Sequence, residues 1–121
     1  MPSATALTIA LFGLSCLVAG IHTLTSPSTY IGNLSLPLQA LPAVYGLGLA
    51  STAMGIYYLL AAYQENRAFF VATVPMRLLT TAVFAGLGGP WRVPAIWEGI
   101  GALITLVALV WERSRERVKM V

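Results

Sequence analysis

The sequence contains no aspartate, and no charged side chain precedes Glu65. Only 9% of its 121 residues are charged, while 58% are hydrophobic. Because a soluble domain carries about 25% charged residues on average, this chain cannot cover a globular surface with groups that water solvates. The missing charges exclude a soluble domain and indicate a membrane protein.

Cysteine and histidine are each present only once, as Cys16 and His22. A single cysteine excludes an intramolecular disulfide and a CxxC motif, and a single histidine excludes a histidine pair for haem or zinc. The sequence also lacks a Gly-rich phosphate loop, an HExxH motif and a GxSxG motif. We therefore expect no metal and no cofactor. Because no nucleic-acid-binding motif accompanies the net charge of +3, we also expect no nucleic acid.

Four apolar stretches each approach the 20 or so residues that a membrane-spanning helix needs. The breaks between them are the proline-containing segment after residue 25, the polar turn at 64–67 and the run Gly88-Gly89-Pro90. The sequence thus predicts an all-α, membrane-embedded four-helix bundle forming one domain over residues 1–121. The expected helices are 4–24, 41–63, 68–87 and 94–111, and a basic tail follows at 112–121.

The basic residues are distributed unevenly along the chain. Four of the seven lie in the last nine positions, namely Arg113, Arg115, Arg117 and Lys119. Cytoplasmic flanks carry an excess of lysine and arginine, and four spans place both termini on the same side. We expect an integral membrane protein of the endoplasmic reticulum with both termini cytoplasmic, and with a polar loop at 26–39 on the opposite side.

Two charged residues fall within predicted spans. Arg77 lies near the middle of the third span, and Glu98 lies about one turn inside the fourth. A charge at this depth costs about 2.5–3.5 kcal/mol on insertion scales and usually faces the protein interior. Polar or small residues at helical spacing predict one inward stripe on each helix. These stripes are Thr8, Ser15 and His22; Tyr45, Gly48, Thr52 and Gly55; Thr73, Arg77, Thr80 and Thr81; and Glu98, Ala102, Thr105, Ala108 and Glu112.

A carboxylate, a guanidinium, an imidazole and a phenol in one apolar chamber suit acid–base chemistry on a lipophilic small molecule. Glu98 is the candidate base or water-positioning group, and Arg77 is its electrostatic partner. His22 or Tyr45 is the candidate proton donor to a leaving oxygen. The aromatic side chains predicted to bind substrate are Tyr45, Trp91 and Trp97.

Structural roles remain open for the same residues. Arg77 and Glu98 are also suited to a structural ion pair, while His22 and Tyr45 are also typical of a membrane interface. A site that opens at the opposite, basic end, beside Glu65 and Arg67, is a competing geometry.

The runs Gly55-Ile56-Tyr57-Tyr58, Tyr63-Gln64-Glu65-Asn66-Arg67, Pro75-Met76-Arg77 and Trp97-Glu98-Gly99 resemble the small four-helix fungal membrane proteins of a DUF4267, DoxX-like group. Some fungal members are similar to integral-membrane epoxide hydrolases of aurovertin- and citreoviridin-type polyketide pathways. The resemblance implies an enzyme that opens epoxides on a lipophilic polyketide intermediate and directs its cyclisation. It also leaves open a noncatalytic membrane chaperone or assembly factor, a lipid or small-molecule binder, and a homo-oligomer.

Overall fold

The computed structural model describes residues 1–120, which form helices and short connections, with no strand among these residues. This confirms the predicted all-α class. The helices are α1 (Ala4–Thr25), α2 (Pro27–Asn33), η1 (Leu38–Ala40), α3 (Leu41–Tyr63), α4 (Arg67–Leu87), η2 (Gly89–Trp91) and α5 (Arg92–Met120). The long helices α1, α3, α4 and α5 are each long and apolar enough to cross a membrane, as predicted.

Local side chains set several helix ends. The Ser3 hydroxyl accepts a hydrogen bond from the Ala6 N–H at 3.0 Å and so caps the start of α1. The Asn66 side chain accepts from the Phe69 N–H at 3.1 Å at the start of α4. Gly88 ends α4 with a φ of +69°, a left-handed conformation that glycine adopts without a steric penalty.

Two predicted boundaries are wrong. The segment 112–120 is not a tail that follows the last helix, because α5 continues as a helix to Met120. Arginine, glutamate and lysine dominate this segment and are good helix formers, so the helix continues beyond its apolar part. The segment 26–39, expected as a loop, contains the short helix α2, which begins with Pro27 at a position where proline is well tolerated.

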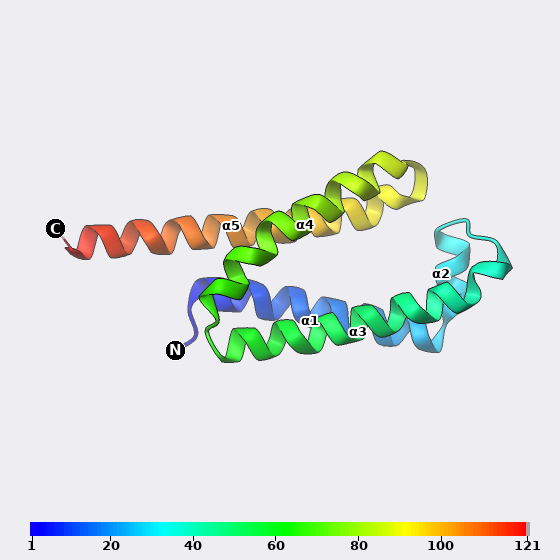
Figure 1. Ribbon diagram of the computed structural model, residues 1–121, viewed down its shortest axis with the longest axis horizontal. Helices are drawn as coiled ribbons and strands as arrows, with labels where there is room; N and C mark the ends of the chain where they lie inside the picture. Colours follow the sequence, from blue (N-terminus) through cyan, green and yellow to red (C-terminus); the bar gives the residue numbers. More distant parts are fainter. Residues whose placement is uncertain (121) are drawn as a thin grey trace.

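The four long helices form two pairs (Figure 1). Helix α1 packs along α3, and α4 packs along α5, while α1 also contacts α5 and so joins the two pairs. The pairs meet at the end of the molecule that holds the N-terminus and diverge toward the end that holds α2 (Figure 1). Contact between the pairs is therefore concentrated toward the N-terminal half of α1.

Glycines allow α1 and α3 to approach closely. A Cβ atom added at Gly20 would lie 2.4 Å from the Thr52 hydroxyl oxygen, and one at Gly55 would lie 2.6 Å from the Leu17 backbone nitrogen. Real Cβ atoms essentially never come this near to other atoms. Small residues at helix interfaces are typical of membrane proteins, where packing, rather than the hydrophobic effect, drives helix association.

Polar side chains of the α3–α4 turn and of α5 bind the start of α1. The Ser3 N–H and hydroxyl donate to the two Glu65 carboxylate oxygens at 2.6 and 2.7 Å. The Thr5 N–H and hydroxyl donate to Glu112 at 3.0 and 2.7 Å, and Arg67 donates to Glu112 at 2.5 Å. The first turn of α1 has no acidic residue of its own. Carboxylates from the α3–α4 turn and from α5 therefore bind its N–H groups and complement its dipole.

Candidate functional site

Arg77 of α4 and Glu98 of α5 are both buried, with only 2% and 5% of their surfaces exposed. The Arg77 guanidinium lies against the turn of α5 that follows Glu98, because a Cβ atom added at Gly101 would be 3.2 Å from Arg77 Nη1. The ion pairs found within residues 1–120 do not include these two residues, and no hydrogen bond joins them. The prediction that both charges are buried is confirmed, but the two side chains form no direct polar contact.

The Arg77 guanidinium extends from α4 to the other helix pair. Its Nε donates to the Thr73 carbonyl at 3.4 Å, and its Nη2 donates to the Thr73 hydroxyl at 3.2 Å. Its central carbon lies 4.7 Å from the ring centroid of Phe12 and 5.9 Å from that of Tyr58. A desolvated cation over aromatic faces is stabilised by the ring quadrupoles. The aromatic faces of α1 and α3 therefore replace part of the hydration that Arg77 loses.

One nitrogen and one oxygen of this charged pair have no partner. Arg77 Nη1 and Glu98 Oε2 are buried and form no hydrogen bond. Burying an unpaired polar atom costs about 1–3 kcal/mol, and more for a charged group. An unpaired donor and an unpaired acceptor, on side chains near enough to interact, are suited to bind a small polar group such as a water molecule or a substrate oxygen.

Further side chains surround the pair. The Tyr58 ring of α3 lies 5.9 Å from the Arg77 guanidinium carbon, and Cys16 of α1 is buried in the same cluster as Phe12 and Tyr58. The Phe12 ring stacks on Trp97 with centroids 4.8 Å apart, so Trp97 also borders this region. We call this set the Arg77 cluster; its members are Phe12, Cys16, Tyr58, Thr73, Arg77, Trp97 and Glu98.

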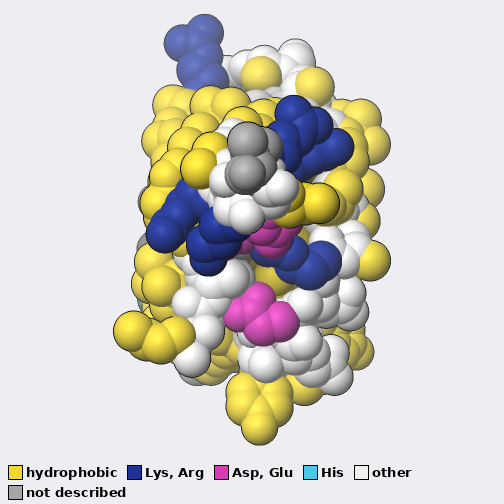
Figure 2. All heavy atoms as spheres, turned by 90° about the vertical axis from the view of Figure 1, so that its left-hand side faces the viewer, with side chains coloured by type: hydrophobic (Ala, Val, Ile, Leu, Met, Phe, Trp, Pro, Cys, Tyr) yellow, Lys and Arg dark blue, Asp and Glu magenta, His cyan; other side chains and the backbone are white. Residues whose placement is uncertain are grey.

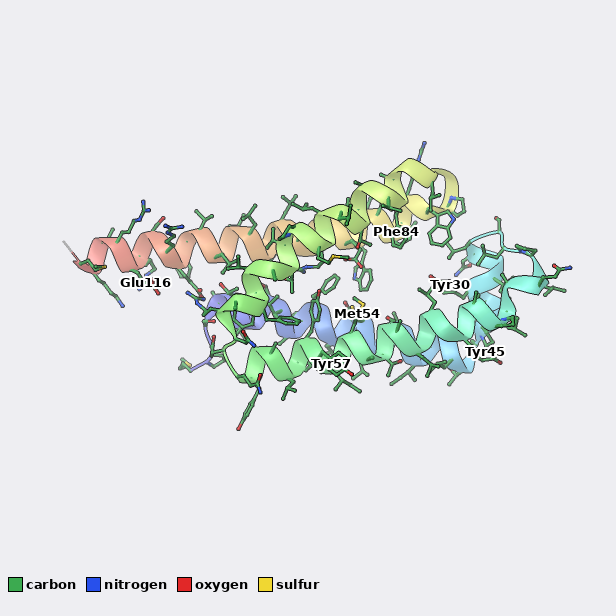
Figure 3. The ribbon with its side chains drawn as sticks, in the orientation of Figure 1. Tyr30, Tyr45, Met54, Tyr57, Phe84 and Glu116 are labelled. Carbon is green, nitrogen blue, oxygen red and sulfur yellow. The ribbon has the colours of Figure 1, made fainter. Side chains whose placement is uncertain are left out.

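His22 and Tyr45 are not part of the Arg77 cluster. His22 is exposed on α1, and 43% of Tyr45 is exposed near the end of α3 that adjoins α2 (Figure 3). The expectation that both side chains face the same interior as Arg77 and Glu98 is therefore wrong. Close packing against α3 turns the face of α1 that carries Gly13 and Gly20 inward, and this leaves His22 outside.

The predicted stripes on α4 and α5 face inward in part, since Thr80, Thr81 and Glu112 are only half-buried. Thr73 and Arg77 are buried on α4, while on α5 the buried residues are Ala95, Glu98, Ala102, Thr105 and Ala108. Trp91 lies outside the Arg77 cluster, half-buried at the end of η2, with its ring centroid 5.2 Å from that of Phe84. Of the three predicted substrate-binding aromatics, the structure places only Trp97 at the buried pair.

Sequence reasoning missed Phe12, Cys16 and Tyr58 as neighbours of the charged pair. A signal was present, because Phe12 and Cys16 are four residues apart and share one helix face with Gly13 and Gly20. Tyr58 follows Gly55 by three residues and thus lies on the same close-packed face of α3. Within residues 1–120, no three His, Cys, Asp or Glu side chains gather in a way that would hold a metal ion.

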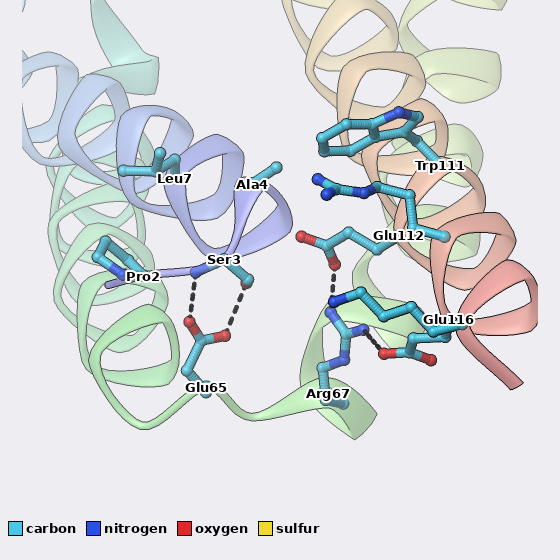
Figure 4. Close-up of a pocket in the computed structure, with 11 residues that line it drawn as sticks. Pro2, Ser3, Ala4, Leu7, Glu65, Arg67, Trp111, Glu112 and Glu116 are labelled. Carbon is cyan, nitrogen blue, oxygen red and sulfur yellow. Dashed lines mark hydrogen bonds and ion pairs between the residues drawn. The ribbon is translucent and has the colours of Figure 1, made fainter.

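A concave region lies at the basic end of the molecule, beside Glu65 and Arg67, where the sequence analysis left a competing site open. This depression of about 690 Å³ lies between the start of α1 and the last turns of α5 (Figure 4). We call it the end groove; its lining residues are Pro2, Ser3, Ala4, Leu7, Glu65, Arg67, Trp111, Glu112, Arg115, Glu116 and Lys119. It shares no residue with the Arg77 cluster.

Comparison with known proteins adds no family assignment. No protein-family model, curated protein or solved structure matches this chain. The DUF4267, DoxX-like resemblance therefore stays a prediction, and the functional argument rests on the residues described above.

Proposed function

We propose that this chain is a membrane-embedded enzyme that opens an epoxide on a lipophilic, polyketide-type intermediate at the Arg77 cluster. The observation that carries the proposal is the pair of unpaired polar atoms, Arg77 Nη1 and Glu98 Oε2, on side chains that are both more than nine-tenths buried. Burying these two atoms without hydrogen-bond partners costs free energy, and proteins retain such a cost at sites where the atoms bind a ligand. A lipophilic substrate reaches such a site from the bilayer without crossing water.

Each side chain has a distinct role in this mechanism. Glu98 acts as the base that activates a water molecule for attack on an epoxide carbon, and the carbon–oxygen bond of the ring then breaks. Arg77 stabilises the negative charge that develops on the released oxygen. Tyr58 replaces His22 and Tyr45 as the proton donor, because its buried ring lies 5.9 Å from the Arg77 guanidinium carbon. The aromatic rings of Phe12 and Trp97 hold the apolar part of the substrate.

Replacing Glu98 with glutamine is the direct test of this function. Glutamine keeps the shape and one oxygen acceptor but is not basic, so we expect turnover to fall by a factor of about 10² to 10⁴. The assay incubates the purified, detergent-solubilised protein with a lipophilic polyene epoxide and follows diol or cyclic ether formation by mass spectrometry. Glu116→Gln, a change at an exposed carboxylate, is the matched control. Full activity in a folded Glu98→Gln protein would refute the proposal, and binding without conversion by the native protein would indicate a binder instead.

Removing the Tyr58 hydroxyl tests the proton donor separately. Tyr58→Phe keeps the ring beside Arg77 and Phe69, whose centroid lies 5.1 Å from that of Tyr58, so the fold should be unchanged. We expect turnover to fall at least about tenfold, within the range for loss of a general acid. Tyr57→Phe, at an exposed neighbouring phenol, should have no effect. Equal activity of both variants would exclude Tyr58 as the donor.

We further propose that the protein lies in the endoplasmic reticulum membrane with both termini cytoplasmic. Arg67 and the basic residues of α5 lie together at one end of the molecule, whereas Arg92 lies at the other end. Figure 2 shows the first end, where blue cationic side chains lie around one magenta patch, a second magenta patch lies among white groups, and yellow apolar side chains form the periphery. This distribution supports a cytoplasmic basic end by the positive-inside rule.

A further inference from the structure

We infer that the end groove is a binding site for the headgroup of an acidic phospholipid from the adjoining leaflet. This site is separate from the Arg77 cluster and does not depend on the proposed enzyme activity. Three features support it. Two cations of the groove form no ion pair, its carboxylates already have other partners, and apolar side chains line the groove beside the cations.

The cations lie on one face of α5. Trp111, Arg115 and Lys119 are spaced four residues apart, so they lie one above another along the helix. The Arg115 guanidinium carbon lies 4.9 Å from the centroid of the Trp111 ring, which holds this cation at the groove. Neither Arg115 nor Lys119 forms an ion pair within residues 1–120. Both charges are therefore available to an anion.

The carboxylates of the groove already have partners other than Arg115 and Lys119. Glu65 accepts two hydrogen bonds from Ser3, and Glu112 accepts from Thr5 and Arg67. Glu116 is 3.7 Å from the second terminal nitrogen of Arg67. Because Ser3, Thr5 and Arg67 are the partners of these acids, Arg115 and Lys119 keep their donors free, even though three acidic and three basic side chains line the groove (Figure 4).

The apolar wall indicates a lipid rather than a soluble anion. Leu7 of α1 and Trp111 of α5 line the groove and are each about half exposed, at 50% and 51%. Both lie on helices that are apolar enough to cross the membrane, and tryptophan favours the headgroup boundary. A lipid bound here would place its phosphate at Arg115 and Lys119 and its acyl chains along Leu7 and Trp111. The volume of about 690 Å³ is sufficient for a phospholipid headgroup.

The test compares two double variants that remove the same charge from different faces of α5. Arg115→Gln with Lys119→Gln changes the groove, whereas Arg113→Gln with Arg117→Gln changes residues that line a separate depression on the other face. Native mass spectrometry of the detergent-purified full chain would measure binding of phosphatidylglycerol and phosphatidylcholine. All four positions are exposed, so thermal unfolding should be unchanged in both variants.

We expect phosphatidylglycerol to bind the native chain at least tenfold more tightly than phosphatidylcholine. The groove variant should lose about tenfold to thirtyfold in affinity for phosphatidylglycerol, as expected for two cations near a headgroup, while the other variant keeps it. Equal losses in the two variants would indicate general charge attraction and overturn the proposal, as would no loss in either. Displacement of phosphatidylglycerol by an equimolar amount of inorganic phosphate would overturn the choice of a lipid.

Discussion

Arg77→Met is expected to destabilise the protein by roughly 3–5 kcal/mol, the cost of removing one partner from a buried charged pair. Methionine retains apolar bulk but leaves the Glu98 carboxylate without a compensating charge in the protein interior. It also removes the hydrogen bonds to Thr73 and the cation–π contacts with Phe12 and Tyr58. Equilibrium unfolding in mixed detergent micelles measures the change.

Arg92→Met is the matched control for this substitution. Arg92 begins α5 and is exposed, so the same chemical change there should alter the free energy of unfolding by no more than about 0.5 kcal/mol. A similarly small effect at Arg77 would mean that this guanidinium reaches the headgroups instead of the interior.

Gly55→Leu is expected to separate α1 from α3. A Cβ atom at Gly55 would lie 2.6 Å from the Leu17 nitrogen and 2.7 Å from the Gly13 carbonyl oxygen. Overpacking in a core costs about 1–3 kcal/mol when side chains can shift, but these neighbours are backbone atoms of another helix. We therefore expect a loss of at least about 3 kcal/mol, measured by unfolding in detergent and by aggregation on gel filtration.

Gly46→Leu controls for the added leucine on the same helix. A Cβ atom at Gly46 meets nothing within 4 Å. Because leucine is a better helix former than glycine by roughly 0.8–1 kcal/mol, stability should stay the same or rise slightly. If Gly55→Leu were tolerated as well as Gly46→Leu, α1 and α3 would not be in the close contact described here.

The spans and the burial of the two charges were predictable because both depend on the cost of placing groups in hydrocarbon. Long uncharged stretches have no stable place in water, and a charge such as Arg77 or Glu98 within a span has no stable place in lipid. These constraints apply to a helix whatever its neighbours are. Periodicity on α4 and α5 then identified the inward faces, since a charge on each helix marks the buried side.

The rotation of α1 was not predictable from its hydroxyl groups. The Ser15 hydroxyl donates to the Phe12 carbonyl of its own helix at 2.6 Å, so it needs no partner in the interior. The Ser15 hydroxyl consequently says little about which side of α1 is buried, whereas the Thr8 hydroxyl does reach the Thr105 hydroxyl of α5 at 2.9 Å. Close approach at Gly13 and Gly20 determines the rotation, and it brings Phe12 and Cys16 to the charged pair.

The choice of proton donor could not follow from sequence for a related reason. Five tyrosines are present, and each has an apolar ring and a polar tip that suits either an interface or a pocket. Tyr45 and Tyr58 differ in burial because Tyr58 lies on the face of α3 that packs against Gly13, whereas Tyr45 does not. That difference arises from the pairing of α1 with α3.

The most direct test of the sheltered charged pair is a double-mutant cycle that combines Arg77→Met with Glu98→Leu. The free energies of unfolding of the native chain, the two single variants and the double variant would be measured in the same micelles. If the two charges share one interior, the double variant should be more stable than Arg77→Met alone, with a coupling of about 1–3 kcal/mol. Additive effects, agreeing to within about 0.5 kcal/mol, would show that the two side chains lie in separate environments and would contradict this account.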